Sequence, residues 1–307
     1  MIRLTSLILA GVIGAGAQLP EPPAPRGSGH LLIDVIAVDR KGLPVTDLRP
    51  GELEVWINGY RVPIESLRVV TPSDSGGRSV VMILDDLTLQ PAVVPRAREA
   101  ARHLVNRMLP DDQMAIVALN GAAMEATSDR ARLLRRIEEY NVRASGVVRL
   151  DALSGQVLEI IASVSRQLAE TSDRKKTIVA IGAPWLFDTP IPPPTVARDL
   201  RKEWTDAVRA MAVAHVNLYV IDPSGVGMSR IAGGSSGFAG ETGGYAFTNT
   251  NDLEGAAERI MREAGSYYVV EVVDPPVGRQ ADLRDLDVRA MRRGVSIQAR
   301  RAIPGAR

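Results

Sequence analysis

The chain has 307 residues, of which 45% are hydrophobic and 24% charged, and this composition excludes a wholly disordered chain, a collagen and a coiled coil. Its formal net charge is +1, so it lacks the basic excess typical of nucleic-acid binders. The sequence has no cysteine, which excludes disulfides, thiolate metal sites and cysteine nucleophiles, and its 3 histidines disfavour a site built on several imidazoles.

The first 17 residues have the layout of a secretory signal peptide. Arg3 supplies a positive charge, an apolar run follows from Leu4 to Ile13, and Ala15-Gly16-Ala17 is a small-x-small cleavage pattern. The alternative is an uncleaved membrane anchor, but the apolar run is shorter than the roughly 20 residues that a spanning helix needs. We therefore predict cleavage after Ala17, a periplasmic or secreted mature protein, and no transmembrane span in the mature chain.

Two stretches precede the main body of the chain. Residues 18–29 are rich in proline and glycine and predict a flexible linker. Residues 30–77 are an N-terminal β segment, in which Asn58-Gly59 is a strong hairpin signal. Strands are expected at 31–38, 53–57 and 60–70.

Residues 78–265 alternate between strand and helix patterns. Continuous apolar runs such as Val80–Leu84 are typical of strands buried on both faces of a sheet. The alternation predicts an α/β domain with a mostly parallel sheet and helices on both faces. Strands are expected at 80–84, 114–119, 177–181 and 216–221, and helices at 96–108, 129–140, 150–168, 196–211 and 252–264.

Residues 266–307 return to β patterns and predict a C-terminal β hairpin or tail. Strands are expected at 267–273, 286–291 and 295–302. This tail and the N-terminal β segment are each too short for a stable core, so we expect them to pack together as one small β unit.

Three stretches of the sequence resemble a known family. They are DVIAVDRKGLPVTDL at 34–48, LDDLT at 84–88, and ETGGYAF at 241–247 followed by NDL at 251–253 and SYYVV at 266–270. Together they resemble the von Willebrand factor A-related proteins found in acidobacteria and other bacteria, over residues 31–302. The resemblance implies a von Willebrand factor A-like (Rossmann-like) α/β fold and a protein-binding role in adhesion or assembly.

The same resemblance implies a divalent cation held by an Asp-x-Ser-x-Ser loop after the first strand of the α/β domain, and this chain departs from that pattern. Asp85 is present, but both serine positions are occupied by Leu87 and Leu89. The later threonine position reads Val-Val-Arg at 147–149, and the last aspartate position reads Gly-Ala-Pro at 182–184. Leucine cannot ligate a hard cation.

Two interpretations of this loop remain open. Asp85, Thr88 and Asp222 are candidate ligands for Mg²⁺, Mn²⁺ or Ca²⁺ in a different geometry. The favoured alternative is that Asp85 caps a helix or binds loop amides, so that no cofactor is needed and the metal site is degenerate.

The candidate partner-binding face lies where the strands of the parallel sheet end, because ligands of open α/β sheets bind beyond the carboxyl ends of the strands. Its residues are Asp86, Asn120, Gly182 and Pro184. We expect a protein partner in the cell envelope or outside the cell, and no nucleic acid.

One motif points to an enzyme. Residues 233–237 match Gly-x-Ser-x-Gly, which would make Ser235 the nucleophile of a serine hydrolase. That motif needs a strand directly before it and a helix directly after it, whereas the flanks here are loop-like. We therefore predict an exported, non-enzymatic protein-binding module. The alternatives are metal-dependent adhesion through Asp85 and Thr88, and hydrolysis at Ser235.

Overall fold

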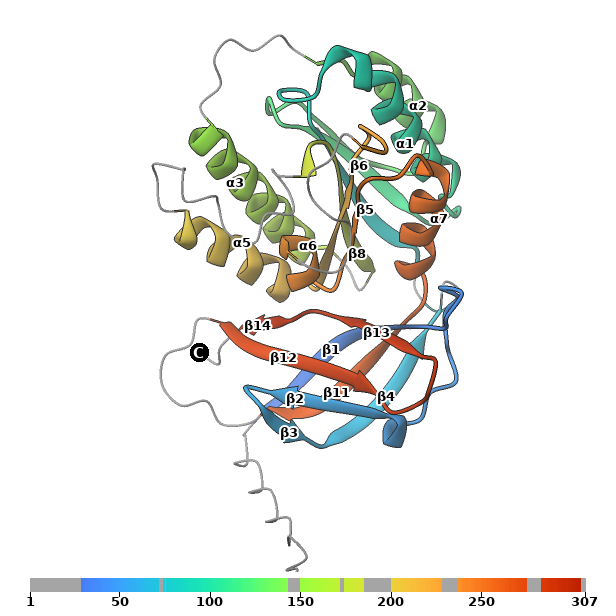
Figure 1. The fold of residues 1–307 in the computed structure, drawn as a ribbon, viewed down its shortest axis with the longest axis vertical. Coiled ribbons are helices and arrows are strands. Elements are labelled where there is room, and N and C mark those ends of the chain that lie inside the picture. The colour runs from blue at the N-terminus through green and yellow to red at the C-terminus, as the bar shows by residue number, and fades with distance from the viewer. Residues whose placement is uncertain are drawn as a thin grey trace, which may run out of the picture.

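The computed structural model describes residues 29–71, 74, 76–142, 150–171, 174–184, 200–227, 237–274 and 283–304. The predicted signal peptide, residues 18–28 of the linker, Ser235 and residues 147–149 lie outside the described residues. In the described part, an α/β unit is stacked on a β unit (Figure 1). No helix in this part combines the length and apolarity needed to cross a membrane.

The α/β unit is built on a six-stranded sheet with the order β10-β9-β8-β5-β6-β7. All neighbours are parallel except β7, which pairs antiparallel with β6 at the sheet edge. The strands are β5 (Arg78–Leu84), β6 (Gln113–Ala118), β7 (Ala123–Thr127), β8 (Lys175–Ile181), β9 (Val216–Ile221) and β10 (Ala246–Phe247). Every residue of β5 and β9 is buried, as their apolar runs predict.

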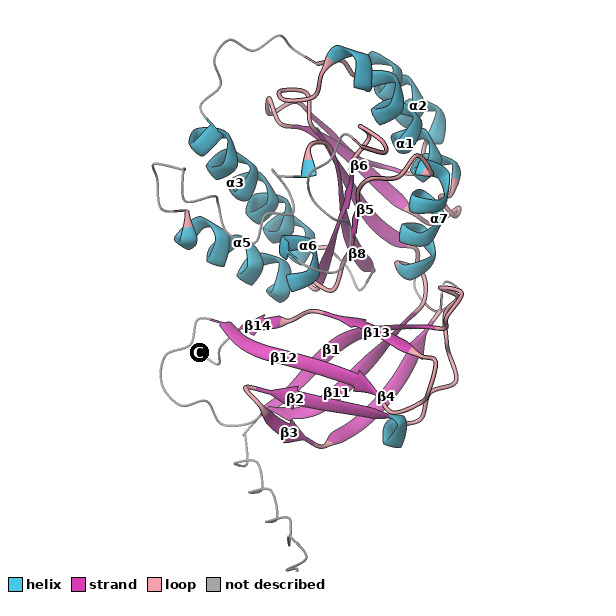
Figure 2. Ribbon diagram, viewed as in Figure 1, coloured by secondary structure: helices cyan, strands magenta, loops and turns pink. Residues whose placement is uncertain are grey.

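Helices cover both faces of this sheet (Figure 2). One face packs against α3 (Leu150–Ala169), α5 (Arg201–Val213) and the short α6 (Gly237–Glu241). The other face packs against α1 (Val94–Asn106), α2 (Arg130–Glu139) and α7 (Leu253–Glu263). The predicted α/β fold class, a mostly parallel sheet between two helical layers, is confirmed.

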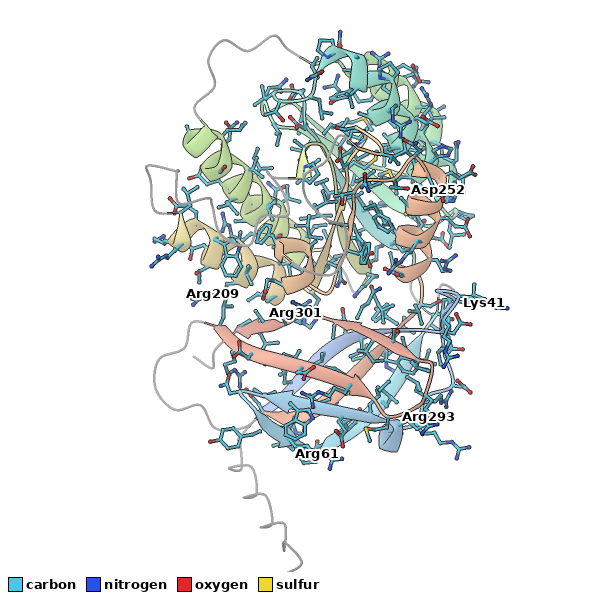
Figure 3. The ribbon with its side chains drawn as sticks, in the orientation of Figure 1. Lys41, Arg61, Arg209, Asp252, Arg293 and Arg301 are labelled. Carbon is cyan, nitrogen blue, oxygen red and sulfur yellow. The ribbon has the colours of Figure 1, made fainter. Side chains whose placement is uncertain are left out.

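Aspartates fix where two of these helices begin. The Asp129 carboxylate accepts the backbone N–H of Arg132 at 2.9 Å at the start of α2. The Asp252 carboxylate accepts the N–H of Gly255 at 2.7 Å, and Figure 3 shows Asp252 at the start of α7. Each cap thereby satisfies one of the N-terminal amides that would lack a helical partner.

The β unit consists of two four-stranded sheets with the orders β13-β1-β11-β4 and β14-β12-β2-β3. Their inner faces form a separate hydrophobic core that includes Ile33, Val55 and Val270. The N-terminal strands are β1 (Gly29–Val38), β2 (Leu53–Ile57), β3 (Tyr60–Val62) and β4 (Ile64–Val70), with a 3-10 turn η1 at Pro50–Glu52. The C-terminal strands are β11 (Tyr267–Asp274), β12 (Leu283–Ala290), β13 (Ser296–Ala299) and β14 (Ala302–Pro304).

Each sheet combines strands from the two ends of the chain, which alternate in the first sheet and meet at the β12–β2 pair in the second. β1 pairs with β11 and β13, and β2 pairs with β12, all antiparallel. The expectation that the two flanks form one β unit is therefore confirmed. The single strand expected at 60–70 divides at Pro63, which has no N–H to donate, and β3 and β4 belong to different sheets. The strand expected at 295–302 likewise divides into β13 and β14 in different sheets.

The β unit contacts the amino ends of the parallel strands. The Nζ of Lys175, the first residue of β8, lies 2.6 Å from Oδ2 of Asp34 in β1 and 4.3 Å from the centre of the Tyr267 ring. Beside this ion pair, Thr242 and Arg300 form an antiparallel β-bridge between the units. The carboxyl ends of the strands consequently lie on the side of the sheet away from the β unit (Figure 1).

Candidate functional site

We call the carboxyl ends of β5, β6, β8 and β9, with the loops at 85–90, 119–122, 182–184 and 222–227, the carboxyl edge. Asp85 is the first residue after β5 and its side chain is fully buried. One carboxylate oxygen accepts the backbone N–H groups of Leu87 at 3.2 Å and Thr88 at 2.8 Å. The other accepts the Thr88 hydroxyl and, at 3.2 Å, the backbone N–H of Ala183. The carboxylate thus shapes its own loop and ties the end of β5 to the loop after β8.

The structure brings together only two of the three candidate metal ligands. Thr88 donates its hydroxyl to Asp85, whereas Asp222 follows β9 and is separated from Asp85 by the intervening strand β8. Asp222 is also buried, and its Oδ1 accepts the N–H of Ser224 at 2.9 Å. Its Oδ2 has no hydrogen-bond partner within the described part of the chain.

A divalent cation at Asp85 would have to displace donors that already occupy both carboxylate oxygens. The Leu87 and Leu89 side chains offer no oxygen in place of the serines of the family pattern. The loop after β8 directs an N–H donor toward Asp85, not a carboxylate. The positive end of an N–H group repels a cation. The described donor set at Asp85 therefore does not fit a hard cation that requires several oxygen ligands.

A different cluster has metal-ligand geometry, and it lies on the β unit. His30, Glu65 and Glu271 come from the neighbouring strands β1, β4 and β11, and one ligand atom from each lies within 4.8 Å of the others. In the structure, His30 Nδ1 is 2.9 Å from a Glu65 oxygen and 3.3 Å from a Glu271 oxygen. All three side chains are at least one-third exposed, so these contacts are also those of an ordinary surface ion-pair cluster.

The residues predicted to form the partner-binding face differ in accessibility. Asp86, Gly182 and Pro184 are buried, and Asn120 is partly exposed. Asn120 donates its backbone N–H to Asp86 at 3.1 Å and its side-chain amide to the same carboxylate. The accessible side chains of the carboxyl edge include Gln90 after β5 and Val226 after β9, which is 60% exposed.

Tyr140, which directly follows α2, belongs to the site but escaped the sequence analysis. Its hydroxyl donates to the backbone carbonyl of Asp85 at 2.6 Å, and its own carbonyl accepts two bonds from Arg98. Burial raises the pKa of Tyr140 well above its ordinary value, and the charges of Asp85 and Asp86 raise it further. Its position three residues after the buried Ile137 is the signal that could have revealed it as inward-facing.

A cavity of about 350 Å³ opens between the ends of β5 and β6 and the end of α2. Leu84, Ile116 and Ala118 provide apolar lining from the strands, and Asp86 and Asn120 provide polar lining. The rim comes from the end of α2 and the residues that follow it, including Arg136, Glu139 and Tyr140. Its volume lies at the lower end of the range of small-molecule pockets, but its lining is more polar than is usual for them.

Ser235, the candidate nucleophile, lies outside the described residues. Each of the three histidines lies within 4 Å of a carboxylate. The pairs are His30 with Glu65 and Glu271, His103 with Glu99, and His215 with Asp34. His30 and His215 lie on the β unit and at the junction of the two units, away from the carboxyl edge.

No protein-family model matches the sequence, and no curated protein matches it. Among solved structures, the chain is similar to an aerotolerance-related membrane protein from Bacteroides fragilis NCTC 9343, with 15% identity, a TM-score of 0.43, and coverage of 61% of this chain and 98% of that one. It is similar to manganese-loaded TRAP protein from Plasmodium vivax, with 11% identity, a TM-score of 0.42, and coverage of 76% and 96%. It is also similar to von Willebrand factor type A from Catenulispora acidiphila, with 9% identity, a TM-score of 0.38, and coverage of 93% and 75%.

Proposed function

We propose that this chain is an exported, non-enzymatic protein-binding module of the adhesion or assembly type, whose partner binds at the carboxyl edge. One observation carries the proposal: the β unit contacts the amino ends of the parallel strands and leaves the carboxyl edge facing away from it. This edge is where open α/β sheets bind their ligands. It also presents Val226, a large apolar side chain that is 60% exposed.

Within this proposal the metal site is degenerate, and binding does not depend on a cation at Asp85. The support is that Asp85 uses both oxygens to hold its own loop and the loop after β8. Export is supported by the charged start, apolar run and small-x-small pattern of residues 1–17.

Site-specific photo-crosslinking in the native cells tests the proposal. A photoreactive amino acid replaces Val226 or Gln90 at the carboxyl edge, and Tyr60 in the β2–β3 hairpin is the control because it is 51% exposed but lies on the β unit. We expect the same discrete protein adduct from Val226 and from Gln90, and none from Tyr60. An adduct from Tyr60 alone, or none from either edge position, would overturn the proposal.

A further inference from the structure

The β unit carries one imidazole and two carboxylates that converge on its surface, outside the carboxyl edge. We call His30, Glu65 and Glu271 the strand triad, because they come from the neighbouring strands β1, β4 and β11. One ligand atom of each lies within 4.8 Å of the others. Ligand atoms that share one Zn²⁺ at about 2.0–2.2 Å are roughly 3–3.5 Å apart. The strand triad therefore needs only small side-chain movements to hold such an ion.

A β-bulge in β4 brings Glu65 into the strand triad. Ser66 lies opposite Glu271. The next pair is Ile64 with Val272, so Glu65 is an extra residue in β4. Without the bulge, regular alternation would place Glu65 opposite Val272, which is fully buried in the core of the β unit. The bulge instead leaves the Glu65 side chain 40% exposed on the outer face, beside Glu271.

A hydroxyl outside the strand triad orients one of its carboxylates. The Ser66 hydroxyl donates to Oε2 of Glu271 at 2.7 Å, while Oε1 of the same carboxylate lies 3.3 Å from His30 Nδ1. Carboxylates that bind metals are commonly held by a second hydrogen bond of this kind, which leaves the other oxygen directed at the ion. Glu271 is therefore positioned before any metal binds.

Both carboxylates of the strand triad approach the same nitrogen atom. Oxygens of Glu65 and Glu271 lie 2.9 Å and 3.3 Å from His30 Nδ1. When that nitrogen carries a proton, it has a single N–H to share between the two acceptors. A divalent cation in place of the proton bonds the nitrogen and both oxygens at once. The geometry therefore suits a metal ion better than it suits hydrogen bonding alone.

We propose that the strand triad binds Zn²⁺ through His30 Nδ1, one oxygen of Glu65 and Oε1 of Glu271, and that the ion ties β1 to β11 and β4. A mixed set of imidazole and carboxylate ligands suits Zn²⁺, whereas Mg²⁺ and Ca²⁺ prefer oxygen ligands alone. Three protein ligands leave the fourth position of a tetrahedral zinc site to water. The site lies on the β unit, so it does not depend on partner binding at the carboxyl edge.

The test is calorimetric titration of the untagged protein with Zn²⁺, and in parallel with Mg²⁺. We expect one equivalent of Zn²⁺ to bind, with an affinity for Mg²⁺ at least about 100-fold weaker. X-ray absorption by the zinc-loaded protein should show one imidazole nitrogen and oxygen ligands at about 2.0–2.2 Å. Absence of stoichiometric Zn²⁺ binding, or bound zinc without an imidazole ligand, would overturn the proposal.

Variants locate the ion. His30→Ala should abolish stoichiometric Zn²⁺ binding, and Ser66→Ala, which removes only the orienting hydroxyl, should weaken it by about 10- to 100-fold. His103→Ala is the matched control, because His103 on α1 has a single carboxylate neighbour, Glu99 at 3.8 Å. It should leave Zn²⁺ affinity unchanged. Zn²⁺ binding that survives His30→Ala, or that is lost equally in His103→Ala, would contradict the assignment.

Hydrogen exchange shows whether the ion joins the three strands. Zn²⁺ should slow amide exchange in β1, β4 and β11 and raise the melting temperature of the wild type, because it binds the folded state. Neither effect should occur in His30→Ala, whose side chain is 60% exposed in the wild type, so that this variant is expected to fold. Slower exchange confined to the α/β unit, or equal stabilisation of His30→Ala, would overturn the proposal.

Discussion

At the scale of single residues, Asp85 determines the character of the carboxyl edge. Three backbone N–H groups and one hydroxyl converge on its buried carboxylate, and they come from two loops. The two carboxylate oxygens that would bind a cation in an adhesion site accept hydrogen bonds from two loops in this protein. Asp85 is therefore expected to matter more for stability than for metal binding.

Asp85→Ala is expected to lower the free energy of unfolding by about 3 kcal/mol, because it leaves three partly buried N–H groups without their acceptor. Thr88→Val removes only the hydroxyl contact and should cost about 1 kcal/mol. Urea denaturation of the two variants measures both losses. Equal, negligible losses would mean that Asp85 does not hold these loops.

The change in melting temperature on adding a divalent cation tests where, if anywhere, the protein binds metal. We expect Mg²⁺ or Mn²⁺ to produce the same change in melting temperature, relative to EDTA, in the wild type and in Thr88→Val. Any stabilisation that does occur should disappear in His30→Ala, because His30, Glu65 and Glu271 are the described cluster with metal-ligand geometry. Stabilisation that is lost in Thr88→Val and kept in His30→Ala would restore the metal-dependent adhesion site.

His215, at the junction between the units, makes the stability of the protein depend on pH. Burial lowers its pKa below the ordinary 6.5; the charge of Asp34 opposes this shift, and Arg300, Lys175 and Lys176 reinforce it. The unfolded chain therefore binds a proton at higher pH than the folded one, and stability must fall as the pH drops through 6.5.

His215→Asn removes this titration, and asparagine tolerates the φ of 56° found at that position. Between about pH 7.5 and about pH 5.5, the urea midpoint of the wild type should fall by more than that of His215→Asn. Parallel pH profiles would contradict the assignment. Burial alone would raise the pKa of Asp34, but Lys175, His215 and Arg300 outweigh it and hold that pKa below 3.8, so the Asp34 contribution is lost only at lower pH.

At the scale of elements, a buried ion pair joins the start of β5 to the chain before β6. Arg78 and Asp112 are 4% and 0% exposed, and the Arg78 Nε lies 3.0 Å from each Asp112 oxygen. Arg78 also donates to the carbonyls of Arg107, just after α1, and Met261 in α7. One side chain thus fixes how two helices and a strand meet.

Asp112→Asn is expected to cost about 3–5 kcal/mol, because it leaves a buried guanidinium without its counter-charge. The neighbouring exposed Asp111→Asn should change stability by less than about 0.5 kcal/mol. Calorimetry or urea denaturation distinguishes these values. Similar losses of unfolding free energy in both variants would show that the buried Arg78–Asp112 pair contributes no more to stability than an exposed aspartate does.

The Thr-Gly-Gly motif, which carries much of the family resemblance, has a packing role. Thr242 accepts the N–H of Leu218 in β9 at 2.8 Å and donates to the carbonyl of Ala239. Gly243 has a φ of 78°, and a Cβ at Gly244 would overlap the backbone of Leu218. The motif therefore allows a close approach of this loop to β9.

The elements that the sequence could not reveal are short or lack a local signal. β7 reads Ala-Met-Glu-Ala-Thr and β10 has 2 residues, so neither has the apolar run that identifies β5 and β9. The contacts of Asp85 could be predicted, because a residue that directly follows a strand lies next to the backbone amides of a loop. The cavity could not be predicted, because Asp86, Asn120 and Tyr140 meet only once α2 has packed against the sheet.

At the scale of the whole molecule, the two ends of the chain depend on each other. β1 lies between β11 and β13, and β12 lies between β2 and β14, so neither sheet of the β unit can form from one flank. We propose that 30–77 and 266–307 are one folding unit and that 78–265 is inserted between them.

A chain ending at Gly265 should lose hydrogen-exchange protection in β1 and β2 while β5 and β8 stay protected, because the removed strands are their hydrogen-bond partners. Protection in β1 and β2 that survives the truncation would contradict this interdependence.

The most direct measurement is the photo-crosslink from Val226 in native cell envelopes, made once in EDTA and once in millimolar Mn²⁺. A module whose carboxyl edge binds a protein without a cation at Asp85 should give the same discrete adduct, in the same yield, under both conditions. An adduct that forms only with Mn²⁺, or no adduct in either condition, would contradict this account.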